Sequence, residues 1–458
     1  MARKVFISFL GTNNYVNCRY QFNDWISEPV RFVQEAMIDY ICSDWTAEDR
    51  ILIFCTSKES TGELGSKELN WFDEGQPKAI DAIEKTGLQT RLQELKQRKD
   101  LKAEIEQVDI SAGFTEEEIW EIFNTVYSKL KTEDEIYFDV THAFRSIPLF
   151  SVVLFNYSKF MIDTRLISIM YGAFEKLGPS YNVKDLPEDK RIAPIIDMTN
   201  IARLQEYNQI ASELKEFGRV KSLQEHIKLH DETTVIQSVR DLKNSISKLD
   251  EYITTINIKE IKKGGFITAF RNNYKNIKKR NDIPKPIKHI LEELNKETAD
   301  FVSAADFKNL EVAINWTIKH EMLTQAFPLA EEYIILRMTE EYRDMIPENL
   351  SNKKRWEFMG SILGMPQTDF NDKRWRNILA EYSDAADDIS EEERIQELRP
   401  KYDVIRRIRN SIAHGNGVFT YEEIKDGIND ILWCLKFINP EYTDYPSTQS
   451  IIKQYHAD

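Results

Sequence analysis

The first 200 residues alternate between short buried-strand patterns and amphipathic-helix patterns, whereas strand patterns fade after about Asn200. Strands are predicted at Val5–Leu10, Ile51–Cys55, Glu135–Asp139 and Leu166–Tyr171, and helices at Pro29–Ile41, from Thr115 to about Leu130 and at Ser146–Met161. A strand–helix–strand rhythm of this kind predicts a mostly parallel sheet with helices on both faces. The chain is therefore predicted to be α/β in its first part and all-α in the rest.

The length of the chain indicates more than one domain, because 458 residues exceed what one ordinary core accommodates. We predict an α/β domain at residues 1–200, a helical linker or insertion region at 201–300 and an α-helical domain at 301–458. Residues 57–112 are polar and poorly periodic, so we interpret them as an insertion into the sheet.

Two features of the C-terminal helices follow from residue spacing. A helix is predicted to begin at the capping box formed by Thr420 and Glu423 and to continue through Trp433. A second set of apolar residues recurs at helical intervals and is predicted to share one helix face. The residues of this set are Ile314, Ile318, Ala326 and Ala330.

Composition excludes several classes of protein. Hydrophobic residues make up 41% and charged residues 30% of the chain, and no run of about 18 apolar residues is present, so no membrane span is expected. The N-terminus lacks the apolar core of a signal peptide, and Cys18, Cys42, Cys55 and Cys434 show no paired spacing for zinc or disulfides. A cytoplasmic protein is therefore expected. The net charge of −15 argues against tight, nonspecific binding to duplex DNA.

The end of one predicted C-terminal helix carries a set of residues suited to phosphodiester chemistry. Arg409, Asn410 and His414 supply a permanent cation, a polar orienting group and a titratable imidazole, and Gly415 is placed to end the helix in a left-handed cap. Such a set can bind a phosphodiester and move protons without a metal. The alternative is a solvated arginine face, since an arginine and a histidine at this spacing also occur by chance.

Three loops are predicted to meet where parallel strands end, the usual place for a ligand in such sheets. They are Gly11–Tyr15, Thr56–Lys58 and Thr141–Arg145. Their hydroxyls, amides, cations and aromatic ring suit a ribose-phosphate ligand with stackable bases, and the glycine motifs of nicotinamide sites and P-loops are absent from the sequence. The alternative is structural: Asp139 and Thr141 would then merely cap the following helix.

The two regions together resemble one known family. Val5–Tyr15 and Asp139-Val140-Thr141-His142 are similar to the CARF domain of the DxTHG-motif group of type III CRISPR accessory proteins, and Arg409-Asn410-x-x-x-His414 resembles the signature of HEPN ribonucleases. The resemblance covers roughly residues 1–200 and 300–458. One departure is Ala143, where the family usually has glycine.

The resemblance implies a Rossmann-like CARF domain that binds a cyclic oligoadenylate, most often the tetramer, across the two-fold axis of a homodimer or higher homo-oligomer. The residues implied as its ligands are Gly11, Thr12, Asn13, Asn14, Thr141 and His142. It also implies a HEPN domain that cleaves single-stranded RNA without a metal, leaving a 2′,3′-cyclic phosphate and a 5′-OH. His414 would then act as general acid or base, Arg409 would hold the phosphate, and Asn410 would orient the reacting groups.

Other interpretations stay open at this stage. The protein could be a non-catalytic sensor or regulator with a helical interaction domain, a nuclease for structured RNA such as tRNA, or a DNA nuclease. The basic segment 259–288, with Phe266, Phe270 and Tyr274, could carry RNA toward the site, although a helical linker with a solvated basic face is preferred. His226 and His230 are assigned to a helix surface rather than to a metal site, and His320 could lie at the periphery of the catalytic groove.

Overall fold

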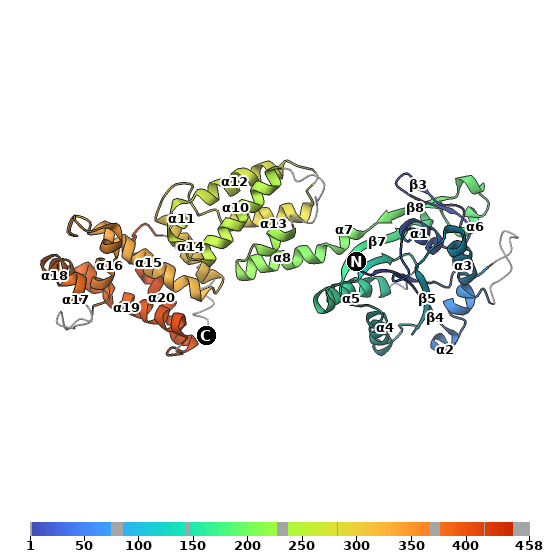
Figure 1. Cartoon of the computed structure of the whole chain (residues 1–458), viewed down its shortest axis with the longest axis horizontal. Helices are drawn as coiled ribbons and strands as arrows, with labels where there is room; N and C mark the ends of the chain where they lie inside the picture. Colours follow the sequence, from blue (N-terminus) through green and yellow to red (C-terminus); the bar gives the residue numbers. More distant parts are fainter. Residues whose placement is uncertain are drawn as a thin grey trace. The chain divides into compact units, whose positions relative to one another are not determined.

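The protein is described here by a computed structural model that covers residues 2–74, 86–142, 146–226, 237–281, 283–365, 376–415 and 417–442. The chain divides into two compact units, Met1–Leu204 and Gln205–Asp458 (Figure 1). The first is α/β and the second is helical, as the sequence predicts. The finer division into residues 201–300 and 301–458 stays a prediction.

The N-terminal unit is built on an eight-stranded sheet in the order β3-β2-β8-β7-β6-β1-β4-β5. The strands are β1 (Lys4–Phe9), β2 (Arg19–Phe22), β3 (Trp25–Ile26), β4 (Arg50–Thr56), β5 (Glu104–Ile110), β6 (Glu135–Asp139), β7 (Arg165–Gly172) and β8 (Ile192–Asp197). The five strands from β7 to β5 are mutually parallel, while β8 runs antiparallel to β7. The predicted mostly parallel sheet is confirmed.

Helices cover both faces of this sheet, because successive residues of its central strands point to opposite sides. Phe6 of β1 packs in a core with α1 (Val33–Ile41) and α3 (Leu88–Lys99). Its neighbours Val5 and Ile7 pack in a second core with α4 (Glu116–Ser128) and α5 (Ser146–Ile162). The buried, apolar central strands therefore fix the sheet between two helical layers.

The interpretation of residues 57–112 as an insertion was wrong for part of that range. It contains β5, which pairs with β4 over seven residues and forms one edge of the sheet. The strand is mostly polar because an edge strand is bonded on one side only, where charged residues discourage pairing with another chain. The segment also contains α2 (Lys58–Thr61), the π-helical turn η1 (Lys67–Trp71) and α3.

Short elements connect β7 to the helical unit. They are η2 (Phe174–Leu177), α6 (Ser180–Val183), η3 (Glu188–Lys190) and α7 (Thr199–Ala202). The helices that follow are α8 (Leu204–Phe217), α9 (Lys221–His226), α10 (Gln237–Thr254), α11 (Ile258–Lys263), α12 (Gly265–Lys278), α13 (Lys285–Glu297), α14 (Lys308–Lys319), α15 (Leu323–Glu341), α16 (Asn352–Leu363), α17 (Arg376–Leu379), α18 (Ser383–Glu391), α19 (Glu393–His414) and α20 (Tyr421–Ile438). In the part of the chain that the structure describes, no helix is both long and apolar enough to cross a membrane.

The helical unit has one continuous core, in which α15 packs against α14, α16, α19 and α20. The prediction that Ile314, Ile318, Ala326 and Ala330 share one helix was wrong. The first two belong to α14 and the last two to α15, and the chain turns between these helices at Glu321, whose φ is 53°. All four side chains nevertheless face the same core, and for this reason their spacing resembles that of apolar residues on one helix.

The predicted helix start at Thr420 is confirmed. Its hydroxyl accepts from the backbone N–H of Glu423 at 3.3 Å, and the Glu423 carboxylate accepts from the backbone N–H of Thr420 at 2.7 Å. At Thr115, where a helix is also predicted to begin, only half of a capping box forms. The Thr115 hydroxyl accepts from Glu118 at 3.2 Å, but the Glu118 carboxylate accepts from the backbone N–H of Phe114 instead.

Candidate active site

The end of α19 is built as the sequence predicts. Ile405 and Ile408 are fully buried, and Gly415 ends the helix with φ of 60°, its N–H donating to the carbonyl of Ile412. The apolar stripe fixes which flank of the helix faces the core, so the polar residues between its members are held at the edge. His414 lies exposed in the last turn, beside the exposed Ala413.

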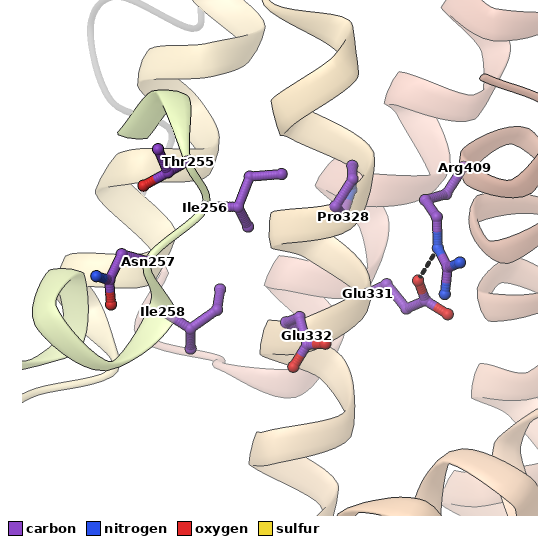
Figure 2. A pocket seen from close by; sticks show the side chains of 8 residues that line it. All are labelled: Thr255, Ile256, Asn257, Ile258, Pro328, Glu331, Glu332 and Arg409. Carbon is purple, nitrogen blue, oxygen red and sulfur yellow. Dashed lines mark hydrogen bonds and ion pairs between the residues drawn. The ribbon is translucent and has the colours of Figure 1, made fainter. Parts of the chain in front are cut away.

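Arg409 is held by two partners. Its Nε donates to the carboxylate of Glu331 on α15 (Figure 2). Its Nη1 donates to Oδ1 of Asn410 at 2.7 Å. Glu331 is only 5% exposed and also accepts from the hydroxyl of Tyr402 at 3.4 Å. The hydrogen bond with Glu331 raises the pKa of Arg409, so the guanidinium stays charged. Asn410 therefore contacts the arginine. His414 lies five residues after Arg409, which corresponds to a rise of about 7.5 Å along the helix.

A cavity of about 670 Å³ opens beside Arg409. Its lining residues are Thr255, Ile256, Asn257, Ile258, Pro328, Glu331, Glu332 and Arg409 (Figure 2). They come from the segment before α11 and its first residue, from α15 and from α19. Burial raises the pKa of Glu332, whose carboxylate accepts from the indole N–H of Trp356 at 3.0 Å. The cavity thus places one guanidinium beside two carboxyl groups, and His414 is not among its lining residues.

The predicted ligand residues of the N-terminal unit gather at one end of two neighbouring strands. Gly11, Thr12, Asn13 and Asn14 follow β1, while Thr141 and His142 follow β6, which pairs with β1 in parallel. The sequence did not indicate Asn70, whose side-chain amide donates to the carbonyl oxygens of Gly11 at 2.7 Å and Asn13 at 3.0 Å. Asn70 lies in η1, 59 residues after Gly11, and no local pattern links the two positions.

Asp139 and Thr141 form a joint between three strands. The buried Asp139 carboxylate accepts from the backbone N–H and hydroxyl of Thr141, at 2.9 and 2.5 Å, and from the hydroxyl of Ser8 at 2.7 Å. The Thr141 hydroxyl in turn accepts from the backbone N–H of Gly172 at 2.8 Å. Burial raises the pKa of Asp139. Both residues therefore have a structural role in joining strands, which differs from the helix cap considered from the sequence, and a ligand-binding role of Thr141 stays a prediction.

His142 packs against Tyr15, with ring centroids 4.4 Å apart. Burial lowers the pKa of His142 to about 4, so its ring is neutral at pH 7. Gly11 lies close to both residues, since a Cβ atom there would come within 2.5 Å of the Tyr15 hydroxyl. The loop after β1 is therefore packed closely on these two rings, and glycine is the residue that allows the close approach.

The basic segment 259–288 has mainly structural contacts. Phe266, Phe270 and Tyr274 are buried in the helical core, so their rings are not exposed for stacking on bases. Nη2 of Arg271 donates to three carbonyl oxygens after α13, and Nζ of Lys288 donates to the carbonyl of Arg280. These contacts favour the interpretation as a helical region over that as an RNA path.

The structure does not describe several other residues that were considered from the sequence. Ala143, Arg145 and His230 lie outside the described residues, and the side chain of His226 is not described. In the parts of the chain that the structure covers, no group of three or more histidine, cysteine, aspartate or glutamate side chains is arranged to hold a metal ion.

His320 lies in the core of the helical unit and not at the cavity. It is 4% exposed, its ring packs on Trp316 with centroids 4.9 Å apart, and Gly218 passes close over both rings. Burial, assisted by Lys319, lowers the pKa of His320 from 6.5 to about 4. The imidazole is therefore neutral in the folded protein, whereas in the unfolded chain it binds a proton below about pH 6.5.

The free energy of unfolding is accordingly expected to fall as the pH drops from about 6.5 to about 4, by at most about 3 kcal/mol from this histidine. A His320→Gln variant lacks that contribution. Urea unfolding of both proteins at pH 7, 5.5 and 4.5 measures the difference between them, in which all other titrating groups cancel. The same pH dependence in both proteins would contradict the assignment.

No family model matches the chain. The chain is similar to the CRISPR-associated protein MJ1674 of Methanocaldococcus jannaschii, with 23% identity over 86% of this chain, and it spans 65% of the length of that relative. Among solved structures, Csm6 of Enterococcus italicus bound to cyclic hexa-2'-fluoro-hexa-dAMP aligns with 12% identity and a TM-score of 0.44, over 99% of this chain and 98% of that one.

Proposed function

We propose that this chain, a CRISPR-associated protein of the CARF–HEPN kind by its motifs and its relative from Methanocaldococcus jannaschii, is an endoribonuclease activated by a cyclic oligoadenylate. The observation that carries the proposal is the end of α19. There a charged, oriented Arg409 lines an open cavity, and its partner Asn410 and an exposed His414 follow within one and a half turns of the helix.

The reaction uses the 2′-OH of RNA as the nucleophile. It attacks the adjacent phosphorus while the P–O5′ bond breaks, giving a 2′,3′-cyclic phosphate and a 5′-OH. His414 transfers protons as general acid or base, a role worth about 10²–10⁴ in rate. Arg409 binds the phosphate and stabilises the charge that builds up in the transition state. This chemistry requires no metal ion from the protein.

The catalytic unit of the proposal is a homodimer. Within one chain His414 is not among the residues that line the cavity beside Arg409, and the small, exposed Ala413 lies between them on the helix. A second copy of α19 packed across a two-fold axis would place two such sets along a shared groove. RNA lying in that groove would meet imidazoles and guanidinium groups from both protomers.

Activation follows from ligand binding at the loops after β1 and β6. The ring nitrogens, backbone groups and side-chain amides of Gly11, Thr12, Asn13, Asn14 and His142 suit the phosphates and bases of a cyclic oligoadenylate, and the tetra-adenylate is the preferred candidate. The ligand activates the nuclease to the extent that it binds the competent arrangement more tightly than the inactive one.

The test is cleavage of a labelled single-stranded RNA by the purified protein, alone and with cyclic tri-, tetra- or hexa-adenylate added separately. We expect low turnover alone, the largest increase with the tetra-adenylate, products with 2′,3′-cyclic phosphate ends, and no loss of activity in EDTA. An all-deoxy substrate should not be cleaved, because it lacks the nucleophile.

Each contrary result has a distinct meaning. Equal turnover with and without every ligand rejects the activation and leaves the nuclease in place. Cleavage of the all-deoxy strand rejects the 2′-OH mechanism. Binding of a cyclic oligoadenylate without cleavage of any RNA indicates a non-catalytic sensor instead.

A further inference from the structure

The carboxylate of Glu331 accepts from the guanidinium of Arg409, and both residues line the cavity. Glu331 belongs to α15, which packs along α19, and its side chain is 7% exposed, compared with 34% for that of Arg409 (Figure 2). Together with the hydroxyl of Tyr402, Arg409 provides the polar contacts of this buried carboxylate. A buried carboxylate is costly unless paired, so the pair holds the guanidinium firmly against α15.

The pairing also leaves one edge of the guanidinium open. Glu331 occupies Nε and Asn410 occupies one hydrogen of Nη1. Nη2 makes no hydrogen bond to any other described residue, and Arg409 lines the cavity. Because the guanidinium is a rigid planar fork, fixing two of its nitrogens also fixes the direction in which Nη2 points. An anionic oxygen in the cavity would meet a preset donor pair formed by Nη1 and Nη2.

We propose that Glu331 is the positioning residue of the site: it orients Arg409 for the phosphate and does not itself touch the substrate. The inference rests on the proposed nuclease function. The negative charge of Glu331 also offsets part of the charge of Arg409, which weakens the attraction of the site for RNA in the ground state. The orientation of Arg409, by contrast, favours the transition state. Loss of the carboxylate should therefore lower kcat and not raise KM.

A Glu331→Gln variant separates these effects, since glutamine keeps the shape and removes the charge. We expect kcat for RNA cleavage at saturating activator to fall by about 10- to 100-fold, because a small misplacement of a catalytic group costs about that much. KM should stay the same or decrease. Glu331→Asp keeps the charge at a shorter reach, and an intermediate kcat is expected.

The chain supplies a matched control in Glu311 of α14. This glutamate is 3% exposed and accepts from the Tyr333 hydroxyl at 2.6 Å and from the Asn439 amide at 3.0 Å, so it is similarly buried and is hydrogen-bonded to neutral partners. Thermal unfolding of Glu311→Gln shows how much a neutral side chain in such a network destabilises the helical unit. This control variant should keep wild-type kcat and KM at a temperature where it is folded.

A double variant completes the test. In a chain that already carries Arg409→Ala, Glu331→Gln should cause no further loss of kcat, because the group it orients is gone. Additive losses, an equal loss of kcat in Glu311→Gln, or wild-type kcat in Glu331→Gln would each overturn the positioning role while the nuclease stands. A wild-type protein that cleaves no RNA with any activator would overturn the proposed function itself, and the positioning role with it.

Discussion

Replacing His414 by alanine is expected to lower RNA cleavage by about 10²–10⁴-fold and to leave binding of the cyclic oligoadenylate unchanged. The ring is exposed in the last turn of α19, and the helix ends at Gly415 through a backbone hydrogen bond that the substitution does not touch. Alanine also favours helix, so the fold should be retained. Single-turnover cleavage of labelled RNA and calorimetric titration of the ligand measure the two quantities separately.

The control for this experiment is His289→Ala, since His289 is another exposed helical histidine, on α13, with no proposed role. It should cleave RNA like the wild type. Wild-type turnover in His414→Ala would show that the site is assigned to the wrong residues. Loss of ligand binding together with loss of cleavage would point instead to a wider structural change.

Replacing Gly264 by alanine is expected to destabilise the helical unit by about 3 kcal/mol or more. Gly264 joins α11 to α12 with φ of 67°, a conformation that costs other residues about 1–2 kcal/mol. A Cβ atom there would also lie 2.3 Å from the backbone oxygen of Val302 and 2.7 Å from the side-chain amide of Asn309. Since one of these is backbone, the connection itself must move. Chemical denaturation followed by circular dichroism measures the loss.

The neighbouring glycine provides the comparison. Gly265 is the first residue of α12, and a Cβ atom there would meet nothing within 4 Å. Gly265→Ala is therefore expected to raise the free energy of unfolding by less than about 1 kcal/mol, because alanine forms helix more readily than glycine. Equal destabilisation by the two substitutions would show that the geometry of this junction is not the one described.

The central sheet was predictable because β1, β4 and β6 contain short apolar runs, a pattern within each strand that indicates a buried strand without knowledge of its partners. The strand β5 was missed because it lies at an edge, where Glu104, Glu106 and Asp109 replace the apolar pattern. The turn between α14 and α15 was missed because both helices present small apolar residues to one core at a spacing that mimics a single helix. The resemblance to CRISPR-associated proteins is confirmed by the relative from Methanocaldococcus jannaschii.

The candidate site was predictable only where local signals define it. The stripe of Ile405 and Ile408 and the cap at Gly415 are contained in one helix, so the positions of Arg409 and His414 on it could be read directly. Glu331 is 78 residues away from Arg409 and reaches it only because α15 packs on α19. The sequence around Glu331 has the pattern of a buried helix and does not indicate that its carboxylate pairs with Arg409.

The Asn70 amide has a consequence for how the loop after β1 can change shape. Its two hydrogen bonds reach main-chain oxygens of Gly11 and Asn13, so they persist whatever side chains the loop carries. Any rearrangement that carries these oxygens away must break both, at about 0.5–1.5 kcal/mol each. The amide thus ties the loop after β1 to η1, and a substitution at position 70 that removes the amide is expected to weaken this connection.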